Sequence, residues 1–92
     1  MTALMIKEIT LKLLNEEGMH ARPAGILVKT ASQFKSKIEI QYNGKTVNAK
    51  SVLGLMSLGM TGLSDFVIKA DGSDAEGALL ALQQLVQNKF QV

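Results

Sequence analysis

The sequence lacks cysteine and contains one histidine among its 92 residues. Without cysteine, the chain has no disulfide scaffold, thiolate zinc site or cysteine nucleophile. A single histidine excludes a metal site built from several histidines, and no metal or cofactor is expected. Aromatic residues are also scarce, at 4% of the chain. They are scattered along the sequence and so offer no platform on which nucleic-acid bases could stack.

An excess of charge of one sign is also missing. Ten basic and eight acidic residues give a net charge of +2, which is too small for a dedicated nucleic-acid or membrane-surface binder. No segment approaches the roughly 20 apolar residues of a membrane span. Residues 1–12 lack the basic start, apolar run and cleavage site of a signal peptide. We therefore expect a cytoplasmic protein without membrane insertion or a nucleic-acid partner, folded as one domain over residues 1–92.

Alternation of apolar and polar residues predicts four strands, at residues 8–13, 37–42, 45–48 and 65–70. Asn43-Gly44 separates the second strand from the third. This pair predicts a two-residue hairpin, because a type I′ turn needs a positive φ at both of its central positions.

Three segments follow the helical period instead. The first begins at about residues 21–23, with an apolar stripe of Ala24, Leu27, Val28 and Ala31. A short helix is expected at 51–58, with Ser51 near its N-cap. In the third, Ser73 and Glu76 predict a capping box, and the apolar stripe consists of Leu79, Leu82, Val86 and Phe90. The order βαββαβα predicts an α+β fold, a four-stranded antiparallel sheet with three helices on one face. A ferredoxin-like topology shares most of this order.

The segment G-M-H-A-R at residues 18–22 combines residues suited to phosphoryl chemistry. His20 lies at the start of the first helix, where free N–H groups and the positive end of the dipole attract an anion. The same environment disfavours a charged imidazole and keeps one nitrogen free as a nucleophile. Arg22 adds a forked donor for phosphate oxygens. The alternative is a solvated histidine without function, and Glu16 and Glu17 are expected to be solvated loop charges.

The short helix at 51–58 carries apolar residues almost all around its axis. Packing on one sheet face cannot bury all of them, so Val52, Leu53 and Met56 are expected to form an exposed docking patch. Loops or a second copy of the chain could cover them instead. Met19, Ala21 and Ile26 are expected to extend this apolar surface beside the histidine. Ser51 is either a helix cap alone or also a phosphorylation site next to the patch.

The sequence resembles the HPr family, the histidine-containing phosphocarriers of the bacterial sugar phosphotransferase system. G-M-H-A-R-P-A at 18–24 looks like that family's active-site signature. N-A-K-S-V-L-G-L-M-S-L-G at 48–59 resembles its second signature, around the regulatory serine, and Y-N-G-K-T-V lies between the two. The resemblance covers almost the whole chain and implies an open-faced β-sandwich.

The resemblance also implies a function. His20 would be phosphorylated on Nδ1 by enzyme I, which draws on phosphoenolpyruvate, and would pass the group to IIA domains of sugar permeases. Arg22 would stabilise the transferring phosphoryl group, while Val52, Leu53 and Met56 would form part of the docking face. Ser51 would be the target of HPr kinase/phosphorylase, and its phosphorylation would promote binding to the catabolite regulator CcpA. Such a chain is a monomeric phosphocarrier and not a turnover enzyme.

The departures from the family pattern include Gly25, which stands where Thr or Ala is common, and a shifted glycine in the loop at 61–64. Three alternative functions stay open. The chain could be a regulatory paralogue of the nitrogen-related phosphotransferase branch, a ferredoxin-like ligand- or RNA-binding module with aromatic residues on its open sheet face, or a dimerisation domain. A Crh-like regulator lacks the histidine, so the presence of His20 disfavours it.

Overall fold

The computed structural model describes residues 6–91, and its elements follow the predicted order βαββαβα. The strands are β1 (Ile6–Lys12), β2 (Lys37–Tyr42), β3 (Lys45–Asn48) and β4 (Asp65–Asp71). The helices are α1 (Ala21–Ala31), α2 (Val52–Ser57) and α3 (Ala75–Gln87). The sheet order is β1-β4-β2-β3 and each neighbouring pair is antiparallel, which settles the topology that the sequence pattern left open.

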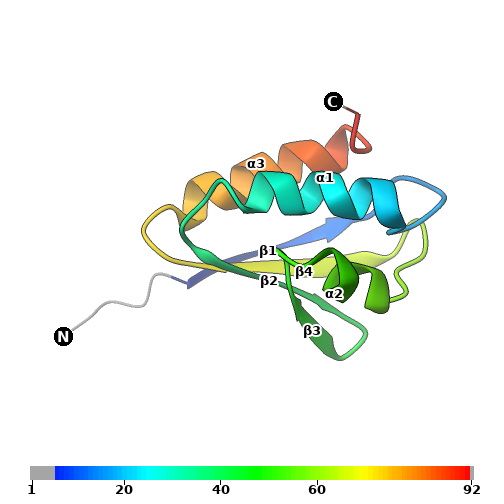
Figure 1. Ribbon diagram of the computed structural model, residues 1–92, viewed down its shortest axis with the longest axis horizontal. Coiled ribbons are helices and arrows are strands. Elements are labelled where there is room, and N and C mark those ends of the chain that lie inside the picture. Colours follow the sequence, from blue (N-terminus) through cyan, green and yellow to red (C-terminus); the bar gives the residue numbers. More distant parts are fainter. Residues whose placement is uncertain (1–5, 92) are drawn as a thin grey trace.

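The helices cover one face of the sheet and leave the other face open (Figure 1). Helices α1 and α3 lie side by side over the strands, and α2 packs against α1 and β3. The alternation in β4 places Phe66 and Ile68 in the core beneath the helices, and β2 contributes Ile38 and Ile40. Burial of each such large apolar side chain stabilises the fold by about 1.5–3 kcal/mol.

The predicted hairpin between β2 and β3 is confirmed. Asn43 and Gly44 have φ values of +51° and +80°, as a type I′ turn requires. The turn sets the register in which Tyr42 pairs with Lys45 and Ile40 with Val47. The two turn residues, Asn43 and Gly44, are therefore sufficient to define how β2 pairs with β3.

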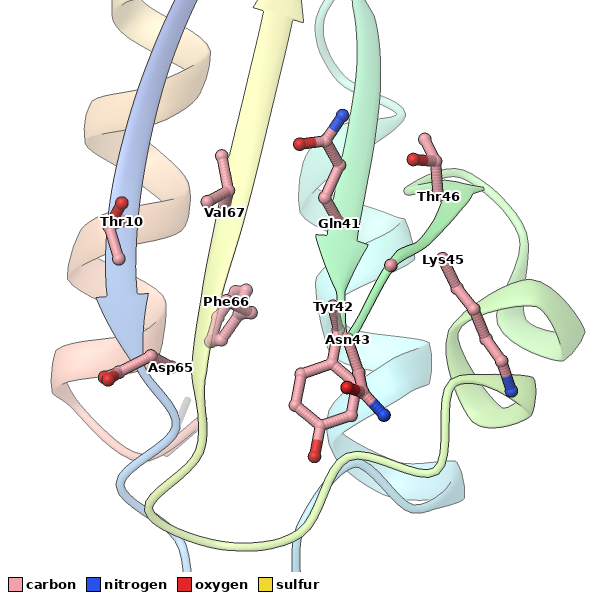
Figure 2. Close-up of a pocket in the computed structure, with 10 residues that line it drawn as sticks. Thr10, Gln41, Tyr42, Asn43, Lys45, Thr46, Asp65, Phe66 and Val67 are labelled. Carbon is pink, nitrogen blue, oxygen red and sulfur yellow. The ribbon is translucent and has the colours of Figure 1, made fainter.

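The open face of the sheet carries polar and aliphatic side chains. A shallow pocket of about 410 Å³ lies at one end of the sheet. Among the residues that line it, Thr10, Gln41 and Val67 stand on three neighbouring strands (Figure 2). All four aromatic residues pack into or against the core: Phe34, Tyr42, Phe66 and Phe90. The aromatic open face expected of an RNA-binding module is therefore absent from the described residues.

The start of α3 differs from the prediction. The N-cap is Asp74, and the capping box of Ser73 and Glu76 does not form. The carboxylate of Asp74 instead accepts hydrogen bonds from the backbone N–H groups of Lys35 (2.8 Å) and Ser36 (2.9 Å), and from the Ser36 hydroxyl. These bonds tie the loop after α1 to the start of α3, a long-range contact that the local pattern does not contain.

The end of α3 also differs. The predicted stripe continues to Phe90, but the helix ends at Gln87. Lys89 and Phe90 then adopt φ values of +55° and +60°, and this left-handed turn carries the Phe90 side chain back into the core, where it is fully buried. The expected burial of Phe90 is correct, although the helical geometry assigned to it is wrong.

We expect Asp74→Asn to lower the melting temperature by several degrees at neutral pH, because the carboxylate loses its charge-assisted hydrogen bonds. The hydroxyl of Ser36 and the N–H of Lys35 hold the pKa of Asp74 below its ordinary value of 3.8. The folded state therefore binds this proton less tightly than the unfolded state, and the stabilisation is lost as pH falls through the lowered pKa.

Thermal unfolding of the wild type and Asp74→Asn across pH tests this expectation. The difference in melting temperature should be largest at neutral pH and should shrink as pH falls below 3.8. Asp71→Asn is the matched control, because it removes the same charge from an exposed position at the end of β4. A difference that is independent of pH, or equal in the control, would contradict the assignment.

Candidate functional site

His20 is the N-cap of α1, and its imidazole is 42% exposed. Its backbone is extended, and its carbonyl accepts the first helical hydrogen bond, from Ala24 at 3.0 Å. Pro23 has no N–H, and the N–H groups of Ala21 and Arg22 find no acceptor among residues 6–91. Two unpaired donors therefore lie at the positive end of the helix dipole, in the two residues that follow His20, as the sequence predicts.

A tight turn holds the loop that carries His20. Gly18 has a φ of +78°, its N–H donates to Asn15 O (3.2 Å), and the Asn15 side chain donates to Gly18 O (2.7 Å). Met19 follows with its side chain buried to 5% exposure and its N–H bonded to Met60 O at 3.1 Å. The expectation that Met19 belongs to an exposed docking surface is wrong, because the turn directs this side chain into the core.

Glu17 contacts the imidazole directly. Its Oε2 lies 3.3 Å from Nε2 of His20, and no hydrogen bond to Nδ1 occurs within residues 6–91. Glu17 is 74% exposed, as expected of a loop charge, but its contact with the imidazole was not predicted. The sequence does contain a signal for this contact, an acidic residue three positions before the histidine with a glycine between them.

Arg22 is not hydrogen-bonded to His20. Its Nη1 donates to the carbonyl oxygen of Phe90 at 3.2 Å, and its side chain lines a shallow cavity of about 350 Å³ together with Glu17 and Lys89. The left-handed turn after α3 presents the Phe90 carbonyl to the guanidinium. The two residues are 68 positions apart, so no local pattern could have revealed this contact.

The loop after α2 is hydrogen-bonded to the segment that precedes α1. Leu63 N–H donates to Leu13 O (2.6 Å), and Leu13 N–H donates to Ser64 O (2.8 Å). Leu63 has a φ of +66°, which accounts for a turn that the sequence left undefined. Together with the bond from Met19 to Met60, these contacts hold both signature segments at the same end of the molecule (Figure 1).

Helix α2 begins as predicted. Ser51 is its N-cap, and Oγ accepts a hydrogen bond from the Gly54 N–H at 3.0 Å. Leu53 is 81% exposed and Met56 41% exposed, while Val52 is partly buried against the core. The helix therefore leaves apolar side chains on the surface, as its composition indicates.

The remaining predicted docking residues lie on α1, which α2 contacts. Ala21 is exposed, and Ile26 is partly buried against the core. We call the set of Ala21, Ile26, Val52, Leu53 and Met56 the apolar patch. Within residues 6–91, no three acidic or histidine side chains gather into a possible metal site, and no helix has the length and hydropathy required to cross a membrane.

Comparison with known proteins places this geometry in a family. The model of the PTS HPr component phosphorylation site matches residues 7–88. HPr-C-His from Thermoanaerobacter tengcongensis is 45% identical, with a TM-score of 0.88 over 91% of this chain and 94% of that one. The phosphocarrier protein HPr of Bacillus anthracis is 42% identical, with a TM-score of 0.82 over 86% and 94%.

A third structure is that of Bacillus subtilis Crh, a catabolite repression protein described as a swapped, intertwined dimer. It is 35% identical, with a TM-score of 0.74 over 89% of this chain and 94% of that one. The family model and the identities to HPr structures agree with the open four-stranded sheet and three helices described above. The chain therefore belongs to the HPr family, the phosphocarrier proteins of the phosphotransferase system.

Proposed function

We propose that this protein carries a phosphoryl group on Nδ1 of His20, from phosphorylated enzyme I to IIA domains of sugar permeases, in the cytoplasm. The observation that best supports this proposal is the partly exposed imidazole at the start of α1, where the N–H groups of the next two residues, Ala21 and Arg22, are unpaired. In the first transfer, the Nδ1 lone pair forms the bond to phosphorus as the donor bond breaks. In the second, a nucleophile of the IIA domain forms the bond to phosphorus as the N–P bond breaks, and the electron pair of the broken bond returns to Nδ1.

A carrier must hold its phosphoryl group firmly enough to keep it and weakly enough to release it. The open position of His20 suits this requirement, because a few donors at a helix start stabilise the group without enclosing it. Arg22 supplies further stabilisation once its guanidinium leaves the Phe90 carbonyl and turns towards the phosphoryl oxygens.

The apolar patch is proposed as the docking face for enzyme I and for IIA domains. It adjoins the histidine through Ala21 and includes Leu53, whose side chain is 81% exposed. Contiguous patches of exposed apolar side chains commonly mark protein interaction sites. The proposed acting form is a monomer, which sedimentation velocity can distinguish from an intertwined dimer.

Transfer assays test the proposed function. The protein is incubated with enzyme I and phosphoenolpyruvate, and is then mixed with IIA domains of sugar permeases or with the acceptor of the nitrogen-related branch. We expect faster transfer to one or more of the sugar-permease domains. Preference for the nitrogen-branch acceptor would identify the chain as a regulatory paralogue and overturn the sugar assignment.

We further propose that Ser51 is phosphorylated by HPr kinase/phosphorylase with ATP. Ser51 is the partly exposed N-cap of α2, directly before Val52 and Leu53 of the apolar patch. A phosphate there adds about two negative charges beside that patch. It should hinder transfer from enzyme I, and in an organism with CcpA it should favour binding to that regulator.

Intact mass after treatment with the kinase and ATP measures this modification. We expect one added phosphate on the wild type and none on Ser51→Ala. Ser57→Ala is the matched control, because Ser57 lies at the other end of α2 with its hydroxyl bonded to Gly54 O. A phosphate retained by Ser51→Ala, or no phosphate on the wild type, would refute the assignment.

A further inference from the structure

The contact between Glu17 and His20 assigns a role to a residue outside the two signature segments. We infer that Glu17 is a positioning residue, which holds the ring proton of His20 on Nε2 and so leaves the lone pair of Nδ1 free for phosphorus. The structural basis is the 3.3 Å separation between Oε2 and Nε2. The consequence for phosphoryl transfer rests on the proposed function, whereas the proton position can be measured without it.

Hydrogen-bond chemistry makes this contact directional. An ionised carboxylate can only accept hydrogen bonds, and a neutral imidazole has one N–H and one unprotonated nitrogen. A hydrogen bond between Glu17 and Nε2 therefore requires the proton to be on Nε2. The carboxylate of Glu17, by accepting the proton of Nε2, leaves Nδ1 with a free lone pair. Carboxylates orient histidine in the same way at other sites.

Both side chains are exposed to solvent, His20 to 42% and Glu17 to 74%, but the backbone between them is held in place. The Gly18 N–H bonds to Asn15 O, and the His20 N–H bonds to Gly18 O at 3.1 Å. Burial of Met19 and its bond to Met60 anchor the segment to the core. These constraints place Glu17 beside the ring, so little backbone freedom has to be lost when the side chains pair.

The same proton position serves transfer in both directions. When Nδ1 bonds to phosphorus, the proton stays on Nε2 and the positive charge of the ring lies beside the Glu17 carboxylate. When the N–P bond breaks, the electron pair returns to Nδ1. The leaving group is then a neutral imidazole and not an imidazolate anion, which would be a much poorer leaving group.

The proton position can be read from the ¹⁵N chemical shifts of the two ring nitrogens of His20, at a pH where the ring is neutral. In Glu17→Lys, the introduced ammonium can only donate, so the ratio of Nε2–H to Nδ1–H should fall about two- to fivefold, the range for an exposed ionic contact. Glu17→Gln should give an intermediate ratio, because its amide oxygen can still accept.

Glu16→Lys is the matched control. It makes the same charge change one residue away, and Glu16 is exposed without a side-chain bond to His20. A shift in the Glu17 variants alone supports the inference. Shifts of equal size in Glu16→Lys and Glu17→Lys, or unchanged ratios in both Glu17 variants, would overturn it.

A second readout links the proton position to transfer. With enzyme I and phosphoenolpyruvate, Glu17→Lys should accept the phosphoryl group more slowly than Glu16→Lys, in proportion to the fall in the fraction of rings that carry the proton on Nε2. Equal rates would refute the catalytic part of the inference. If the wild type accepts no phosphoryl group, the proposed function fails, and the ¹⁵N ratios still decide whether Glu17 sets the tautomer.

Discussion

Gly18→Ala is expected to lower the free energy of unfolding by about 2–4 kcal/mol and to slow phosphorylation of His20. The φ of +78° at this position costs an L-residue about 1–2 kcal/mol. A Cβ atom on Gly18 would also overlap the carbonyl oxygen of Met60. The turn must therefore shift, and with it the hydrogen bond from Met19 to Met60 that places the histidine.

Gly44→Ala separates the cost of the positive φ from the cost of the overlap with Met60. Gly44 has a φ of +80°, close to that of Gly18, but a Cβ atom there meets nothing within 4 Å. Chemical denaturation should therefore show a loss of about 1–2 kcal/mol in Gly44→Ala and a larger loss in Gly18→Ala. Phosphorylation by enzyme I should be unchanged in Gly44→Ala. Equal losses of stability in the two variants would show that the contact with Met60 has no consequence.

Arg22→Ala is expected to slow phosphoryl acceptance by His20 about 10- to 100-fold, because a charged hydrogen bond to the transferring group is lost. Its fold should be almost unaffected. Within residues 6–91, the one hydrogen bond that the guanidinium makes is to Phe90 O, and the loss of such a bond costs about 1 kcal/mol.

Rapid-quench measurement of His20 phosphorylation, with unfolding measured in parallel, tests this role of Arg22. Arg22→Lys should fall between the wild type and Arg22→Ala, because lysine keeps the charge and loses the forked pair of donors. Lys29→Ala is the matched control, since it removes a charge from the far end of α1. A wild-type rate in Arg22→Ala would show that Arg22 does not contact the transferring group.

Features set by neighbouring residues could be predicted from the sequence. The alternation in β4, the Asn43-Gly44 turn and the cap formed by Ser51 each depend on a few adjacent side chains, and the structure has all three. The capping box at Ser73 failed because the adjacent Asp74 bonds instead to a loop 38 and 39 positions earlier. Local propensity cannot anticipate that partner.

The candidate site divides in the same way. The position of His20 at a helix start follows from the proline and the apolar stripe of α1, both of which are local. Burial of Met19 depends on Met60, and the placement of Arg22 depends on Phe90, and both partners are distant in sequence. The contact with Glu17 is local, but it needs the left-handed turn at Gly18, whose geometry the sequence permits without requiring it.

The most direct test of the central claim is to locate the phosphoryl group after incubation with enzyme I and phosphoenolpyruvate. We predict one acid-labile phosphoryl group, assigned to Nδ1 of His20 by ³¹P and ¹⁵N NMR, and none on His20→Ala. A wild-type protein that stays unmodified, or that carries its phosphoryl group on another residue, would contradict the account.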